Sequence, residues 1–92
     1  MGIDEIAKEA AELIAGDRGD YGDFRPNLEL CGNLWSSYLG AKRNVHLDIS
    51  GEDVAMLMVL LKAARVASGG YKKDNFVDIA GYASIAGAFK SD

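Results

Sequence analysis

Residues 53–82 read DVAMLMVLLKAARVASGGYKKDNFVDIAGY, an apolar run that leads into a charged junction. A helix can bury the eight consecutive apolar residues 54–61 only by packing over most of its circumference. Basic residues follow at Lys62 and Arg65, and a Gly-Gly pair then interrupts the helical pattern. The stretch therefore predicts a central buried helix whose basic end leads, through a tight turn, into a helix that begins with carboxylates.

Start and stop signals give the boundaries of these two helices. Ser50 followed by Asp53 is typical of a capping box, in which each side chain accepts a hydrogen bond from the other residue's backbone N–H. We predict the first of the two helices at 51–68, ended by the Gly-Gly pair. The second is expected at about 74–90, with a frayed tail.

Two further helices are predicted upstream. Residues 3–15 place apolar side chains on one stripe at helical spacing. We interpret the acids on the other side as a solvated face: Glu5, Glu9 and Glu12.

The second predicted helix begins with Asn27 as its N-cap and ends at Gly40. Gly32 lies inside it, at a cost of about 1 kcal/mol relative to alanine. We expect a close helix crossing there, because a missing side chain lets two backbones approach. Cys31 and the aromatic pair Trp35 and Tyr38 are interpreted as core, with base stacking by the pair as the alternative.

Four helices with connections at 16–26 and 41–50 predict an all-α fold, a small bundle that forms a single domain over residues 1–92. A chain this short buries only about 60–65% of its unfolded surface, and its apolar run exceeds what three thin helices cover. We therefore expect homo-oligomerisation to complete the bundle.

Composition excludes several classes of function. The net charge of −4 leaves no electrostatic footprint for non-specific nucleic-acid binding. Because Cys31 is the only cysteine, an internal disulfide and a cysteine-based zinc site are excluded. We see no signal-peptide pattern and no apolar run long enough to span a membrane, so we expect a cytoplasmic protein without a membrane partner.

The charged junction is the candidate site. Lys62 and Arg65, three residues apart, share a helix face, while Asp74, Asp78 and Tyr82 project from one side of the next helix at four-residue spacing. Because the turn folds that helix back, Asp78 is expected to reach Lys62 or Arg65. Two interpretations stay open: an interhelical salt bridge, or cations that hold phosphate oxygens while the carboxylates orient them or bind Mg²⁺.

The sequence resembles a small family of unknown function carried by tailed phages and prophages. The similarity covers about residues 17–88 and is spread over several motifs. These are Tyr21-Gly22-Asp23, Asn27, Leu34-Trp35-Ser36-x-Tyr38-Leu39, Glu52-Asp53-Val54-Ala55, Met58, Leu61-Lys62, Arg65, Lys73-Asp74-Asn75, Val77-Asp78 and Ala80-Gly81-Tyr82-Ala83. The resemblance implies a protein made inside an infected bacterium.

The chain is also similar, more loosely, to MazG-like all-α nucleotide pyrophosphohydrolases. Those enzymes collect Mg²⁺ around a triphosphate with Glu-Glu-x-x-Glu on one helix and Glu-x-x-Asp on a later one. Here the acids of residues 3–15 are spaced differently, and Asn75 stands where the first carboxylate of the second motif is expected. Because fewer acids hold metal ions less well, the resemblance favours nucleotide binding over hydrolysis.

We therefore expect a protein that binds a phosphorylated nucleotide-type ligand without turning it over, and that sequesters a host immune signalling nucleotide. Basic residues would contact phosphate, the acids and Asn75 would orient those cations or recognise ribose and base edges, and Tyr21 or Tyr82 would stack on a base. The predicted ligand-binding residues are Tyr21, Arg25, Asn27, Lys62, Arg65, Lys73, Asp74, Asn75, Asp78 and Tyr82.

Two alternatives remain. The first is a Mg²⁺-dependent pyrophosphohydrolase that uses Asp74 and Asp78 with acids of residues 3–15; only this alternative needs a cofactor. The second is an inhibitor that binds a host protein through its helical surface, with every polar pair structural.

Overall fold

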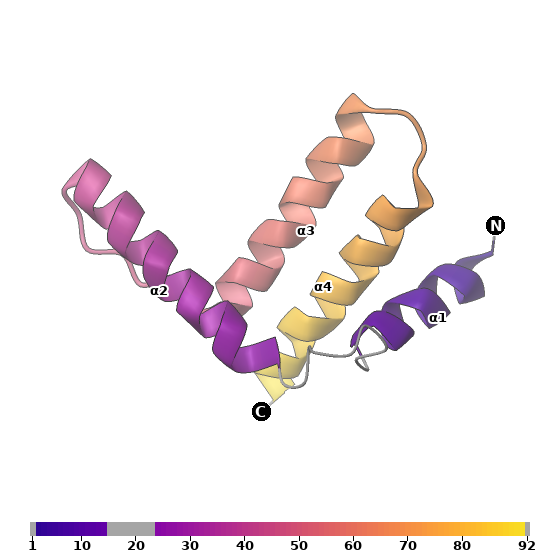
Figure 1. Cartoon of the computed structure of the whole chain (residues 1–92), viewed down its shortest axis with the longest axis horizontal. Coiled ribbons are helices and arrows are strands. Elements are labelled where there is room, and N and C mark those ends of the chain that lie inside the picture. The colour runs from indigo at the N-terminus through magenta and orange to yellow at the C-terminus, as the bar shows by residue number, and fades with distance from the viewer. Residues whose placement is uncertain (1, 15–23, 92) are drawn as a thin grey trace.

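The computed structural model describes residues 2–14 and 24–91. The helices in these ranges are α1 (Ile3–Ile14), α2 (Phe24–Arg43), α3 (Gly51–Ser68) and α4 (Lys73–Ser91). No strand occurs in the same ranges, and the all-α prediction is confirmed. In space α1 packs on α4, α4 on α3, and α3 on α2 (Figure 1).

The α3–α4 pair forms an antiparallel hairpin whose ends follow the predicted signals. The Ser50 hydroxyl accepts a hydrogen bond from the Asp53 N–H at 3.1 Å, and the Asp53 carboxylate accepts one from the Ser50 N–H at 3.1 Å. After the last turn of α3, the Gly69 N–H donates to the Arg65 carbonyl oxygen at 3.1 Å. These bonds satisfy backbone groups that a helix end otherwise leaves unpaired, so the predicted capping box and Gly stop are confirmed.

The predicted ends of the second helix are wrong, because α2 begins before Asn27 and continues beyond Gly40. Pro26 lies in the first turn, where a backbone N–H has no intrahelical partner, so the proline does not break the helix. The helix ends instead at Arg43, and the next residue, Asn44, adopts the left-handed conformation with φ of 55°. The Val45 N–H then donates to the Gly40 carbonyl oxygen at 3.0 Å, the bond typical of a Schellman-type end.

Gly32 does allow a close backbone approach, but the approaching segment is not a helix. A Cβ atom at this position would collide with the carbonyl oxygen of Ile49, in the connection that runs back along α2 (Figure 1). The Ile49 N–H donates to the Ser36 hydroxyl at 2.8 Å, and that hydroxyl donates to the Gly32 carbonyl oxygen at 2.7 Å. The expectation of a helix crossing is therefore wrong; residues 44–50 fill that place.

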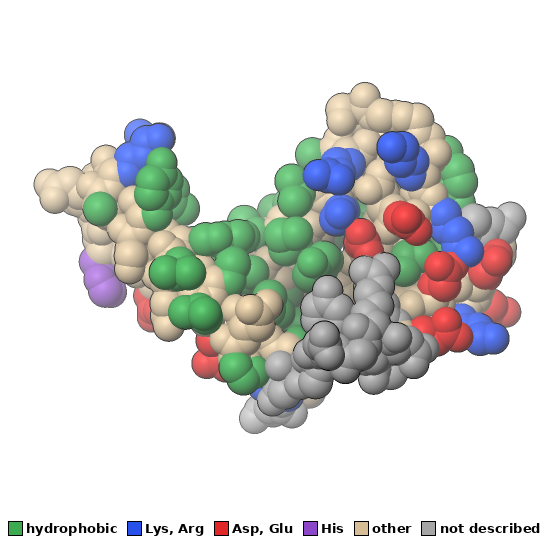
Figure 2. Space-filling view, viewed as in Figure 1, with side chains coloured by type: hydrophobic (Ala, Val, Ile, Leu, Met, Phe, Trp, Pro, Cys, Tyr) green, Lys and Arg blue, Asp and Glu red, His purple; other side chains and the backbone are tan. Residues whose placement is uncertain are grey.

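The arrangement of the helices is open, because α2 diverges from the α3–α4 hairpin in a V (Figure 1). The base of the V is held by the edge of Phe24 against Phe89, with ring centroids 5.6 Å apart. The radius of gyration is 14.5 Å, compared with about 12 Å for a compact domain of this length. Figure 2 shows a hollow between α2 and the α3–α4 hairpin.

The hydrophobic core of the single chain is small. Its buried apolar residues in the described ranges are Ala10, Val54, Ala55, Val77 and Ala86. The prediction that the apolar run of α3 is buried over most of its circumference is wrong for one copy of the chain. Among the described helices, α4 and α2 make the main contacts with α3, and Leu60, for example, stays 61% exposed. None of the described helices has the length and hydropathy needed to cross a membrane.

Candidate functional site

Opposite charges meet where α3 packs against α4. Lys62 Nζ lies 3.1 Å from Asp78 Oδ2, and the two side chains are only 16% and 24% exposed. Ion pairs that are largely removed from water are less screened by salt than pairs in bulk solvent. The structure confirms that Asp78 reaches Lys62, and the pair fixes the two helices of the hairpin to each other.

Arg65 lies about one turn beyond Lys62, near the C-terminal end of α3. The residue is exposed, and its guanidinium forms no ion pair or hydrogen bond with another residue of the described ranges. Its charge complements the negative end of the helix dipole. Figure 2 shows basic side chains gathered around this end of the hairpin, with acidic side chains beside them.

The remaining predicted residues of α4 differ in their surroundings. Asp74 is exposed in the first turn of the helix, whereas Asn75 is buried with 9% of its surface exposed. The Asn75 N–H donates to the Lys72 carbonyl oxygen at 3.2 Å, which closes the turn into α4. Tyr82 is half-buried two turns further on. The helix thus presents Asp74, Asp78 and Tyr82 on successive turns, as their spacing predicts.

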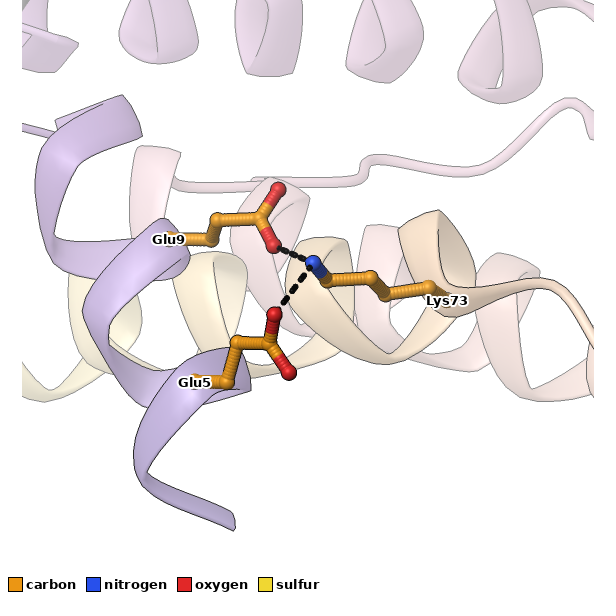
Figure 3. A network of polar contacts seen from close by, with 3 residues as sticks. All are labelled: Glu5, Glu9 and Lys73. Atoms are coloured by element: carbon orange, nitrogen blue, oxygen red, sulfur yellow. Dashed lines mark hydrogen bonds and ion pairs between the residues drawn. The ribbon is translucent and has the colours of Figure 1, made fainter. Parts of the chain in front are cut away.

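Lys73 contacts the first helix rather than the basic pair of α3 (Figure 3). Its Nζ lies 3.4 Å from Glu5 Oε1 and also contacts Glu9 Oε2. The hydrogen bond to Glu9 raises the pKa of Lys73 above its ordinary value of 10.5, and the nearby charge of Glu5 acts in the same direction. The face interpreted as solvated stays exposed at Glu5 and Glu12, but Glu5 and Glu9 also bind this lysine across the α1–α4 contact, which the sequence interpretation did not include.

Two of the predicted ligand-binding residues, Arg25 and Asn27, lie at the opposite end of the molecule. Arg25 places its guanidinium 5.1 Å from the ring centre of Phe24 and 5.6 Å from that of Phe89, near the C-terminal end of α4. Phe89 follows Asp74 by fifteen positions in α4, which corresponds to roughly 22 Å along the helix axis. Within one chain, Arg25 and the exposed Asn27 are therefore separated from the hairpin residues. The predicted residue Tyr21 lies outside the described ranges.

Comparison with known proteins gives a family. The model of the family described as Domain of unknown function (DUF6378) matches residues 5–90. The chain belongs to this family.

Two proteins similar to this chain come from phages. Over 81 residues, 87% of this chain, it is 47% identical to the Gene 55 protein of Mycobacterium phage L5 and 44% identical to that of Mycobacterium phage D29. The chain spans about half the length of these curated relatives, 49% and 50% respectively. No solved structure matches it. The resemblance to a phage family of unknown function is thus confirmed, whereas the similarity to MazG-like enzymes stays a prediction.

In this DUF6378 chain, Asp78 and the acids of α1 lie in different contacts of α4. Asp78 binds Lys62, while Glu5 and Glu9 bind Lys73 on the other contact of α4. In the part of the chain that the structure describes, no three acidic, histidine or cysteine side chains gather in a way that could hold a metal ion. The pyrophosphohydrolase alternative would require these carboxylates to exchange their lysine partners for Mg²⁺.

Sequence reasoning missed an aromatic pair at the turn of the hairpin. The ring of Tyr71 stacks on Phe76 with centroids 5.8 Å apart and planes 27° apart, and Tyr71 is 67% exposed. The sequence feature that could have indicated this pair is a tyrosine directly after the Gly-Gly break, five residues before a phenylalanine. It presents an exposed aromatic surface at the end of the DUF6378 hairpin that also carries Arg65.

A second hollow, of about 410 Å³, lies at the other end of α3. Its lining includes the carboxylates of Glu29, Asp48 and Glu52. Lys90 contacts one of them, with its Nζ 3.7 Å from Glu52 Oε2. An acidic hollow repels phosphate, so the hairpin end is the better candidate for an anionic ligand.

Proposed function

We propose that the basic end of the α3–α4 hairpin binds a small phosphorylated ligand of the nucleotide type. The observation that carries this proposal is the exposed guanidinium of Arg65, which forms no ion pair within the described ranges. Since Asp78 compensates the charge of Lys62, the cations left for an anion at this end of the described hairpin are Arg65 and the exposed Lys72 in the turn. A guanidinium suits this task because parallel N–H donors match two phosphate oxygens.

Neighbouring side chains provide the other contacts that a nucleotide needs. Asp74 is exposed in the first turn of α4 and can accept hydrogen bonds from a ribose or a base edge. The exposed ring of Tyr71 and the half-buried ring of Tyr82 offer surfaces for base stacking, which contributes about 1–3 kcal/mol per base in single-stranded nucleic-acid complexes. In this proposal Asp78 holds Lys62 in place beside the phosphate.

The proposed role is sequestration in the cytoplasm of an infected bacterium. The two similar proteins are phage proteins, and a phage gains from removing a nucleotide that signals host immunity. Sequestration requires binding without chemistry, and it is compatible with carboxylates that are already paired with lysines.

Isothermal titration calorimetry with ATP, cyclic di-AMP and inorganic pyrophosphate as probes tests the proposal. Replacing Arg65 by alanine removes a hydrogen bond to a charged group, worth about 1.5–3 kcal/mol. We therefore expect Arg65→Ala to raise the Kd of the bound probe at least about tenfold. Arg43→Ala is the matched control, because this exposed arginine lies at the far tip of α2 and should leave the Kd unchanged.

The other outcomes separate the alternatives. If Arg65→Ala lowers the melting temperature and leaves the Kd unchanged, the cation is structural and the proposal fails. Release of pyrophosphate from ATP in the presence of Mg²⁺, lost in Asp78→Asn, would favour the enzymatic alternative over sequestration. Binding of no probe, together with a host protein in a stable complex, would favour the inhibitor alternative.

A further inference from the structure

An apolar face of α3 is left uncovered in the single chain. Met56, Leu57 and Leu60 are 45%, 41% and 61% exposed. Helical spacing places them on the side of α3 opposite Lys62, which faces α4. A helix face in contact with water ordinarily carries charged and polar residues, but the exposed residues that continue this face toward the end of α3 are Ala64 and Ala67.

A matching apolar stripe follows α2. Leu30, Leu34 and Tyr38 recur every four residues and are 56%, 61% and 65% exposed. Figure 2 shows hydrophobic side chains lining the hollow between α2 and the hairpin. The six exposed side chains of the two helices form what we call the α2–α3 apolar face: Leu30, Leu34, Tyr38, Met56, Leu57 and Leu60.

The accessible surface of the chain is larger than that expected for a compact monomer of its mass. The accessible surface of 6348 Å² exceeds by about 1,200 Å² the roughly 5,200 Å² expected for a folded monomer of this mass. Stable interfaces bury about 800 Å² on each partner, and obligate homodimers bury about 1,000 Å² or more. The surplus is thus large enough for an obligate interface.

We propose that the α2–α3 apolar face binds a second copy of this chain, in a two-fold dimer where each copy inserts its α2 into the hollow of the other. The small buried core favours a copy over a different protein. A chain that depends on a partner to complete its core needs that partner whenever it folds, and a copy of itself is always present. Each copy offers both a projecting helix and a hollow, so one isologous contact covers both apolar stripes.

Two measurements on the unaltered chain test this dimer. Analytical ultracentrifugation is expected to give twice the 9.8 kDa mass of one chain. Because unfolding would separate the copies, the melting temperature should rise with protein concentration. From the average unfolding enthalpy per residue, we expect a rise of about 8 °C for a hundred-fold increase in concentration. A folded monomer whose melting temperature is independent of concentration would overturn the proposal and assign the face to a different partner.

Variants locate the interface. Leu60→Glu and Leu34→Glu place a carboxylate on each stripe of the α2–α3 apolar face, and we expect both to abolish the dimer in ultracentrifugation. Ile3→Glu is the matched control, because this residue of α1 is 86% exposed but lies outside the face; its mass should stay that of a dimer.

Unaltered dimer mass in both face variants would overturn the assignment of the surface. Should both variants fail to fold, the concentration dependence of the unaltered chain still decides between dimer and monomer. These tests of the dimer do not depend on ligand binding at Arg65, because the α2–α3 apolar face lies on the side of α3 away from α4.

Discussion

At the scale of single residues, replacing Gly32 or Gly87 by alanine should change the stability in opposite directions, because the surroundings of the two glycines differ. A Cβ atom at Gly32 would collide with the backbone carbonyl of Ile49, which cannot move without breaking the Ile49 N–H bond to Ser36. At Gly87, in the interior of α4, nothing lies within 4 Å of the corresponding position. Helical spacing cannot distinguish the two glycines, since only the returning connection makes the first one necessary.

We expect Gly32→Ala to lower the free energy of unfolding by about 1–3 kcal/mol, the usual cost of overpacking. Gly87→Ala should raise it by up to about 1 kcal/mol, because alanine favours the helix and meets no obstacle. Urea unfolding followed by circular dichroism measures both values. Equal effects of the two substitutions would contradict the close approach of residues 44–50 to α2.

At the scale of elements, local signals predict boundaries only where local chemistry fixes them. The capping box of Ser50 and Asp53 was predictable because both partners are three residues apart and bind each other. The ends of α2 were not, since Pro26 is tolerated in a first turn and Gly40 is overruled by the left-handed turn at Asn44. The same contrast holds in the candidate site: the hairpin predicts the contact of Lys62 with Asp78, whereas the contact of Lys73 with α1 depends on packing between distant segments.

The attachment of α1 to α4 should depend on the charge of Lys73. We expect Lys73→Met to lower the melting temperature and to speed amide hydrogen exchange in α1 several-fold, because two carboxylates lose their cation. Lys8→Met is the matched control, because Lys8 is exposed on α1 and forms no ion pair in the described ranges. Equal losses in the two variants would show that Lys73 does not hold the helix.

The pH dependence of that contact has a definite sign. Because its bond to Glu9 raises the pKa of Lys73 above 10.5, the stabilisation is complete below the unfolded-state pKa and is lost as the pH rises through the folded-state pKa. The difference in melting temperature between the unaltered chain and Lys73→Met should therefore be the same at about pH 7 and about pH 9. It should shrink only at higher pH. A difference that already disappears by about pH 9 would contradict the raised pKa.

At the scale of the whole molecule, the open V explains why the sequence predicted the fold class but not the burial of its central helix. The apolar run of α3 was read as a core element, and its exposed side in one chain is the surface that we assign to a second copy. An apolar pattern does not show whether a side chain is buried by its own chain or by a second copy, because the pattern indicates only that the side chain avoids water.

Small-angle X-ray scattering distinguishes the ways in which two such chains can associate. A dimer in which each copy fills the other's hollow should be compact, with a radius of gyration of about 16 Å, the value for a compact body of twice this length. Two copies joined end to end would have their centres about 46 Å apart along the long axis. With a radius of gyration of 14.5 Å for each copy, such a dimer would have a radius of gyration of about 27 Å. We expect the compact value for the unaltered chain and for Ile3→Glu. The extended value at dimer mass would mean that the helix tips, and not the α2–α3 apolar face, join the copies.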